Sequence, residues 1–224
     1  MLFDGALLPQ CDASLFDPVG AEPVVVGGRG AAWFVLTPAG DAVLRHYRRG
    51  GVVAHFSHRT YLWSGAERTR SFREFRLLRT LREHGLPVPT PLAAAYWRHG
   101  TSYRAALLML RLAATQSMGA LLDRGEVPAW AAIGSTIARF HRAGACHADL
   151  NVDNVLMDAN GTCWLIDFDR GTLRTPARGW QGANIARLQR SLRKRLGARA
   201  DSALIVAGWN AMLSAYRIAM EDSA

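Results

Sequence analysis

The chain reads Cys146-His147-Ala148-Asp149-Leu150-Asn151-Val152-Asp153-Asn154 and then Trp164-Leu165-Ile166-Asp167-Phe168-Asp169. Between these stretches lie two short apolar runs, Val155–Met157 and Cys163–Ile166, on either side of Asp158–Gly161. This turn segment ends in Asn-Gly, a dipeptide that supplies the positive φ angles of a tight turn. The pattern therefore predicts a β-hairpin that begins directly after the first stretch.

The hairpin would bring three polar side chains to one edge of a sheet. Asp149 and Asn154 precede its first strand, and Asp167 follows its second strand. This pattern is typical of phosphoryl transfer from ATP, which needs one carboxylate to orient and deprotonate a hydroxyl and two oxygen ligands for Mg²⁺. We predict Asp149 as the catalytic residue, Asn154 and Asp167 as metal ligands, and His147 as a brace of the loop. A buried hairpin with polar flanks, and a cap role for Asp167, are the alternatives.

Composition places the chain among ordinary globular proteins. It has 224 residues, of which 50% are hydrophobic and 20% are charged, enough for one domain or two closely joined lobes. The net charge is +9, and Lys194 is the only lysine, so arginine supplies nearly all of the positive charge. This surplus indicates an anionic partner such as phosphate, nucleic acid or an acidic membrane. The three cysteines are widely spaced and fit no metal-binding template, which favours a reducing compartment.

No targeting or membrane-spanning segment is expected. The N-terminus, Met1–Gly5, has no basic region and no continuous apolar run. The longest apolar candidate, Ala105–Leu110, falls far short of the ~20 residues of a spanning helix. We therefore expect a protein that is soluble or peripheral to a membrane.

The first half of the chain is expected to be rich in β-structure. Glycine and proline turns separate three short apolar runs, so we predict strands over residues 23–26, 31–36 and 42–47. Apolar residues at three-residue steps predict a helix from about residue 67 to residue 84, and Gly85 would end it. Two further strands are predicted near residues 92–98 and 103–112.

The second half is expected to be mainly helical. A short helix near residues 119–122 and a longer one over residues 128–143 precede the hairpin. Beyond the hairpin, Ile185, Leu188, Leu192 and Leu196 form an apolar stripe within an arginine-rich helix, and a last helix runs from about residue 202 to residue 220.

The whole chain resembles the lipopolysaccharide core kinases of the protein-kinase-like superfamily, and within them the 3-deoxy-D-manno-octulosonic acid (Kdo) kinases of Gram-negative bacteria. The resemblance covers about residues 26–190. It is carried by Gly28–Gly30, Leu44–Gly51 (LRHYRRGG), Arg70–Leu78, Gly85–Pro89, His147–Asn151 and Ile166–Gly171 (IDFDRG). It implies an α+β, bilobal protein-kinase-like fold in one kinase-like unit, residues 1–224. A small β-rich N-lobe would span about residues 1–112, and a reduced helical C-lobe about residues 113–224.

The resemblance also implies a nucleotide site. A glycine loop that contains Gly27, Gly28 and Gly30 would let backbone amides approach the phosphates of ATP, although such loops are often simple hairpins. Protein kinases hold the phosphates with a lysine that pairs with a helix glutamate. Here Arg45 stands in the lysine position, and Glu74 is its expected partner; an exposed helix charge is the alternative for Glu74.

Two departures from protein kinases are visible. Asp169 replaces the glycine of D-F-G, which puts the usual activation segment in doubt, and no A-P-E stretch follows. The peptide-binding platform of a protein kinase is therefore expected to be absent. The resemblance implies as acceptor a hydroxyl, the 4-OH, of Kdo on Kdo-lipid A at the cytoplasmic face of the inner membrane. Arg48, Arg49 and Arg170 would face this anionic sugar, and other arginines would face the anionic membrane surface.

Two alternatives remain open at this point. One is a kinase of another acceptor, such as a core heptose, an aminoglycoside or a protein; a chain of charge +9 does not favour cationic aminoglycosides. The other is a pseudokinase that binds anionic lipid or nucleic acid. Intact Asp149, Asn154 and Asp167 disfavour it, and the arginines lack the interleaved aromatic residues that stack on bases, so no nucleic-acid partner is expected.

Overall fold

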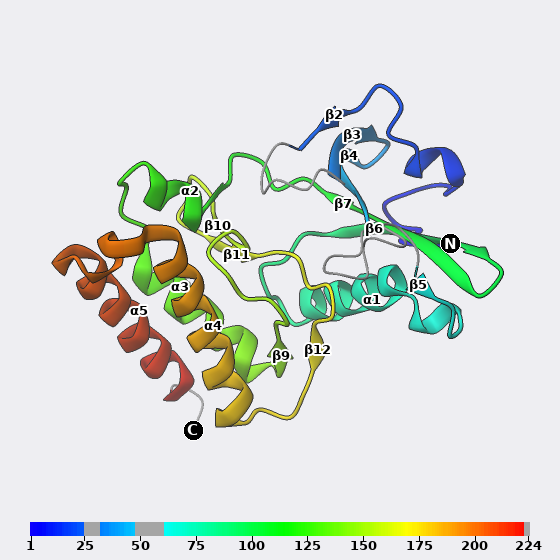
Figure 1. Ribbon diagram of the computed structural model, residues 1–224. Helices are drawn as coiled ribbons and strands as arrows, with labels where there is room; N and C mark the ends of the chain where they lie inside the picture. The colour runs from blue at the N-terminus through cyan, green and yellow to red at the C-terminus, as the bar shows by residue number, and fades with distance from the viewer. Residues whose placement is uncertain (25–31, 48–60, 222–224) are drawn as a thin grey trace. The chain divides into compact units, whose positions relative to one another are not determined.

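The structure, a computed structural model, describes residues 1–24, 32–47 and 61–221. The chain divides into two compact units: Met1–Arg79 with Pro89–Arg111, and Thr80–Val88 with Leu112–Ala224. The first unit is built mainly on a β-sheet and the second mainly on helices, as the colours of Figure 1 allow the reader to follow. This confirms the expected α+β class with a β-rich N-terminal part and a helical C-terminal part.

Within the described residues, the first unit holds a seven-stranded antiparallel sheet. Its order is β1-β6-β7-β4-β3-β2, and β5 also pairs with β7. The strands are β1 (Leu2–Phe3), β2 (Glu22–Pro23), β3 (Ala32–Thr37), β4 (Gly40–His46), β5 (Tyr61–Leu62), β6 (Pro91–His99) and β7 (Ser102–Leu110). Because β4 lies between β3 and β7, Arg45 is in the interior of the sheet, opposite Ala32 and Leu107.

The predicted strands are found with shifted ends. The runs at residues 31–36 and 42–47 correspond to β3 and β4, and the two later runs correspond to β6 and β7. The run at residues 23–26 overlaps β2 at Pro23, Val24 follows that strand, and residues 25 and 26 lie outside the described residues. Strands β1 and β5 were not anticipated, because two residues are too short to show an alternating pattern.

The first helix, α1, spans Arg70–Glu83 and begins later than the sequence pattern predicted. A 3₁₀ turn, η3 (Ala66–Arg68), precedes it, and Thr69 between them is extended. The buried stripe of α1 is the predicted one: Phe72, Phe75, Leu78 and Leu81. Its end is a Schellman motif, in which Leu86 N–H donates to the Leu81 carbonyl at 3.0 Å and Gly85, at φ 68°, donates to the Arg82 carbonyl at 2.8 Å.

Within the described residues, the second unit combines helices with two small sheets. Its helices are α2 (Met118–Asp123), α3 (Trp130–Arg142), α4 (Arg178–Leu196) and α5 (Ala203–Glu221), with the 3₁₀ turn η4 (Gly197–Asp201) before α5. Its strands are β8 (Gln116–Ser117), β9 (Ala145–Cys146), β10 (Val155–Met157), β11 (Cys163–Leu165) and β12 (Thr172–Leu173). Strand β10 pairs with β11 and β8, and β9 pairs with β12.

The predicted hairpin is confirmed as β10 and β11, with Val155 opposite Leu165. Its turn differs from the expectation that both Asn160 and Gly161 supply the positive φ angles of a tight turn. Gly161 has φ 80°, but Asn160 is not among the residues with positive φ. Gly161 N–H donates to the Asp158 carbonyl and Asp158 N–H donates to the Thr162 carbonyl, both at 3.1 Å. The turn is therefore a longer loop in which only the glycine is left-handed.

Helices α3 and α5 pack together through two glycines. A Cβ atom added at Gly134 of α3 would lie 2.1 Å from the Met212 carbonyl oxygen of α5. A Cβ atom added at Gly208 of α5 would lie 2.2 Å from the Trp130 indole nitrogen. The missing side chains let the two backbones approach closely, so α5 is anchored on α3 along one face.

The outer face of α5 corrects one expectation from the sequence. By length and composition, Ala203–Glu221 is apolar enough to cross a membrane, and few of its residues are buried. Leu204, Val206 and Ile218 are exposed. The expectation that no segment approaches a spanning helix was therefore wrong, because the apolar residues of α5 are separated by polar and small ones and form no continuous run. Length and composition do not by themselves distinguish a spanning helix from a packed helix.

Candidate active site

The loop between β9 and β10, residues 147–154, is held by the buried imidazole of His147. The Nδ1 atom of His147 accepts the Asp149 backbone N–H at 3.1 Å, and Nε2 lies 2.9 Å from the Ile166 carbonyl oxygen. Since an amide can only donate and a carbonyl can only accept, the proton is on Nε2 and the ring is neutral. Burial lowers the pKa of His147, which favours this neutral form. These contacts fit the predicted role as a brace.

Asp149 turns its carboxylate toward solvent while its backbone is fixed. The side chain is 64% exposed. The backbone carbonyl accepts Nδ2 of Asn151 at 3.0 Å and Nδ2 of Asn154 at 2.9 Å. Oδ2 of Asp149 lies 3.3 Å from Nδ2 of Asn151, and Oδ1 lies 3.7 Å from Arg187. A carboxylate that is exposed on a firmly bound loop can receive a hydroxyl without rearrangement of the backbone.

Asn154 is buried and oriented by its amide nitrogen. Because Nδ2 donates to the Asp149 carbonyl, Oδ1 is the group of this side chain that can face a cation. The Asn154 backbone carbonyl accepts the Ile166 N–H at 3.1 Å, which ties the loop to the residue after β11. The structure thus links the segments that contain two of the predicted metal ligands, Asn154 and Asp167.

Asp167 has a left-handed backbone, with φ 61°, which is unusual for a residue with a side chain. The next residue, Phe168, is 1% exposed. Its ring stacks on Phe140 with centroids 5.6 Å apart and lies 4.6 Å from the ring of His147. The buried ring holds a backbone conformation that costs about 1–3 kcal/mol, and such conformations concentrate at functional sites.

Sequence reasoning missed the contribution of α4. Asn184 accepts the His147 N–H at 3.1 Å with Oδ1 and donates to the His147 carbonyl at 3.0 Å with Nδ2. Further along the same helix, the hydroxyl oxygen of Ser191 accepts a hydrogen bond from the Val152 N–H at 3.2 Å. The polar residues lie beside the predicted stripe of Leu188 and Leu192. The sequence shows only that Asn184 and Ser191 are spaced along this apolar stripe, and this spacing does not identify the loop residues that they bind.

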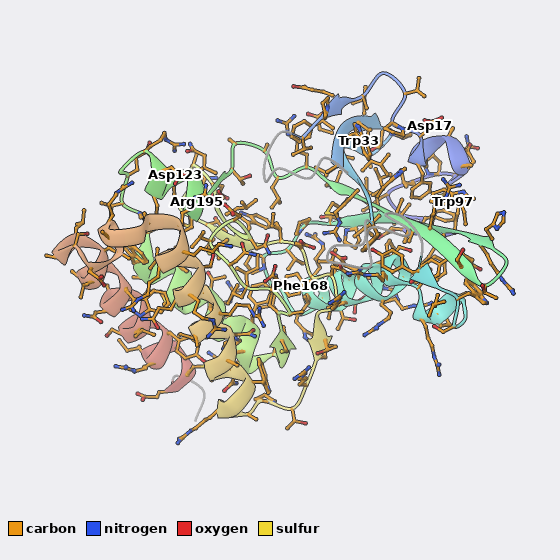
Figure 2. All side chains as sticks on the ribbon, viewed as in Figure 1. Asp17, Trp33, Trp97, Asp123, Phe168 and Arg195 are labelled. Carbon is orange, nitrogen blue, oxygen red and sulfur yellow. The ribbon has the colours of Figure 1, made fainter. Side chains whose placement is uncertain are left out.

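A second missed residue, Arg195 of α4, clamps the loop to α2. Its guanidinium donates to Asp153 at 2.8 and 3.0 Å and to Asp123 at 2.6 to 3.2 Å, and Figure 2 shows Arg195 beside Asp123. The two carboxylates raise the pKa of Arg195, and Arg195 lowers the pKa of Asp123. A Cβ atom at Gly119 would lie 2.5 Å from Oδ1 of Asp153, so the clamp fills the space over this glycine.

In the first unit, Arg45 of β4 forms an ion pair with Glu74 of α1. The predicted partnership is therefore confirmed. Glu74 is 3% exposed and also accepts the hydroxyl of Tyr47 at 2.6 Å. Burial and the Glu74 charge raise the pKa of Tyr47 well above its usual value, so the phenol remains a donor. The buried carboxylate of Glu74 holds the guanidinium of Arg45 in position. Breaking the pair would be costly, because it would leave a charge without its partner in the interior.

Several predicted site residues cannot be placed. Gly27, Gly28 and Gly30 lie outside the described residues, and so do Arg48 and Arg49. Among the described residues, no group of three or more His, Cys, Asp or Glu side chains is arranged to hold a metal ion. Cys11, Cys146 and Cys163 are free thiols.

Comparisons with known proteins identify the family of the chain. The profile of the Lipopolysaccharide kinase (Kdo/WaaP) family matches residues 22–216. The chain is 55% identical over 204 residues to a 3-deoxy-D-manno-octulosonic acid kinase of Stenotrophomonas maltophilia (strain R551-3), and 56% identical over 207 residues to one of Xanthomonas euvesicatoria pv. vesicatoria. Each match covers 89% of this chain and 82% of the relative. A Xylella fastidiosa kinase of the same name is 52% identical over 91% of this chain and 84% of its own length. The chain therefore belongs to the lipopolysaccharide kinase family and is a phosphotransferase that acts on a hydroxyl group.

Proposed function

We propose that the protein transfers the γ-phosphoryl group of ATP to a hydroxyl, the 4-OH, of Kdo on Kdo-lipid A during synthesis of the lipopolysaccharide inner core. Membership of a kinase family implies ATP as the phosphoryl donor. The acceptor is inferred from relatives that are named Kdo kinases and cover most of the chain. The observation that carries the proposal is the exposed carboxylate of Asp149 on a loop bound on several sides.

Asp149 is the proposed catalytic residue. Its carboxylate would accept a hydrogen bond from the sugar hydroxyl, orient that oxygen toward the γ-phosphorus and take the proton as the new oxygen–phosphorus bond forms and the bond to ADP breaks. His147 cannot replace it in this role. Both ring nitrogens of His147 are bound to the backbone, and burial lowers its pKa.

Asn154 and Asp167 are the proposed Mg²⁺ ligands, and their chemistry fits the ion. An amide oxygen and a carboxylate are hard oxygen donors, and Mg²⁺ in nucleotide sites is usually held by one or two protein oxygens together with the phosphates. When bound, the ion supplies charge neutralisation on the phosphates.

Arg45, with Glu74 and a glycine loop that includes Gly27, Gly28 and Gly30, is proposed to bind the phosphates of ATP. The guanidinium is held by a buried carboxylate and by the ring of Tyr47, which lies 4.9 Å below it. A fork of donors fixed in this way can bind phosphate oxygens in pairs. We also propose that the two compact units are the N-lobe and the C-lobe of a single kinase.

The proposed location is the cytoplasmic face of the inner membrane, where the enzyme would be peripheral. The acceptor would be a lipid, and the chain carries a net charge of +9 that favours an anionic surface. Exposed Leu204, Val206 and Ile218 on α5 could add contact with the acyl region, so arginines need not be the sole means of attachment.

The test is direct phosphorylation of a purified acceptor. Enzyme, ATP and Mg²⁺ are incubated with Kdo-lipid A, and mass spectrometry measures the mass of the product. One added phosphate on the Kdo residue is expected, and fragmentation assigns the hydroxyl. The control is Asp149→Asn, which should lose about 10²- to 10⁴-fold in rate while it retains its fold. Equal use of a lipid that carries a neutral sugar would favour a kinase of another acceptor.

A further inference from the structure

One face of α4 lies along the candidate catalytic loop. Three side chains of the helix bind this loop in order: Asn184 to His147, Ser191 to Val152 and Arg195 to Asp153. Their spacing of seven and four residues places them on a single helix face. These contacts have distances between 2.8 and 3.2 Å, and each satisfies a backbone group or a carboxylate of the loop. Their role is to position the loop.

Arg187 belongs to the same face but differs in its contact. It lies three residues after Asn184 and four before Ser191, and its NH1 atom is 3.7 Å from Oδ1 of Asp149. The distance exceeds that of a hydrogen bond, and the two side chains are 47% and 64% exposed. An exposed pair of this kind contributes about 0–1 kcal/mol to folding. Stability therefore does not explain a cation at this position.

The charge balance of the loop suggests what the cation does. Arg195 is already bound to two carboxylates, Asp123 and Asp153. During phosphoryl transfer, two further negative groups come close to Asp149: the phosphoryl group and the carboxylate of a sugar acid. A half-exposed guanidinium next to Asp149 can bind an incoming carboxylate through paired hydrogen bonds, because it is not committed to a short contact with Asp149.

We propose that Arg187 binds the carboxylate of the acceptor sugar and thereby places the attacking hydroxyl at Asp149. This inference rests on the proposed function. In a 3-deoxy-octulosonic acid the carboxylate is attached to the ring carbon two positions from the carbon of the 4-hydroxyl. A group that binds this carboxylate must consequently lie close to the group that receives the hydroxyl proton, as Arg187 does. Arg187 is an acceptor-binding residue in this scheme.

The experiment compares Arg187→Ala with Arg193→Ala. Arg193 is on the opposite side of α4, and its guanidinium also forms an exposed ion pair, 3.8 Å from Asp201. Both variants lose one charge from the same helix. Arg187→Ala should raise the KM for Kdo-lipid A by about ten- to a hundred-fold, the usual effect of losing a charged hydrogen-bond partner, while the KM for ATP changes by less than about two-fold. Arg187→Lys should recover part of the loss. Arg193→Ala should match the wild type.

A second acceptor separates the carboxylate from the phosphates. With a Kdo lipid whose carboxylate has been converted to an amide, the wild type and Arg187→Ala should have similar KM values. Three results for Arg187→Ala would each overturn the inference. They are a KM defect of the same size with the amide acceptor, a parallel rise in the KM for ATP, and an acceptor KM equal to that of Arg193→Ala. Circular dichroism and the KM for ATP report whether the variant is folded. A wild-type enzyme that does not phosphorylate Kdo-lipid A would instead overturn the proposed function, and the inference with it.

Discussion

His141 should make the fold sensitive to mild acid. This residue of α3 is 1% exposed, and its Nδ1 atom lies 2.8 Å from the hydroxyl of Tyr216 on α5. The ring of Trp180 covers it edge-on at 5.1 Å. Burial lowers the pKa of His141 from 6.5 to about 4, and a hydrogen bond with Asn184 opposes this effect in part. The perturbation is His141→Gln, which removes the titrating group.

The sign follows from proton binding. Between pH 6.5 and about 4 the unfolded chain binds a proton at His141 that the folded chain does not, so stability falls as the pH falls. At pH 7.5 proton binding at His141 does not affect stability, because the group is neutral in both states. At pH 5 the free energy of unfolding should be lower by about 2 kcal/mol. The full loss, reached below pH 4, is roughly 3 kcal/mol. Burial also lowers the pKa of His147, so the wild type should lose more than His141 alone accounts for.

The assay is urea unfolding of the wild type and His141→Gln at pH 7.5 and pH 5, followed by circular dichroism. The difference in unfolding free energy between the two pH values should be about 2 kcal/mol smaller in the variant. His99→Gln, at an exposed residue of β6, is the matched control and should behave as the wild type. An equal pH dependence in the wild type and His141→Gln would refute the reasoning.

Arg45→Ala should raise the KM for ATP, and Arg45→Lys should recover only part of it, because an ammonium does not reproduce the guanidinium fork; wild-type kinetics in both would mean that another cation holds the phosphates. Asp167→Ala should raise the Mg²⁺ concentration needed for half-maximal activity, and an unchanged Mg²⁺ titration would exclude it as a ligand. Gly134→Ala should cost about 1–3 kcal/mol in urea unfolding, since its Cβ would meet α5 at 2.1 Å. Gly182→Ala on α4, with nothing within 4 Å, is its control, and equal stability of the two variants would contradict the close helix contact.

The features that the sequence predicted well are those that depend on neighbouring residues. The hairpin of β10 and β11, the buried stripe of α1 and its end at Gly85 follow from apolar periodicity and from the backbone freedom of glycine. The pairing of Arg45 with Glu74 was also foreseen, through the family resemblance and not through local pattern. The starts of β2 and α1 were less accurate, because a strand or helix boundary depends on capping and pairing contacts.

The contacts made by α4 required the tertiary structure. Asn184 binds His147 across 37 residues of sequence, and Arg195 binds Asp153 across 42. Periodicity indicates which face of α4 is apolar, but the partner of that face depends on how the helices pack around the loop. For the same reason, the sequence does not distinguish Arg187 from the other arginines of this charged helix. Its position beside Asp149 arises only when the helix and the loop, each locally predictable, are brought together by packing between residues distant in sequence.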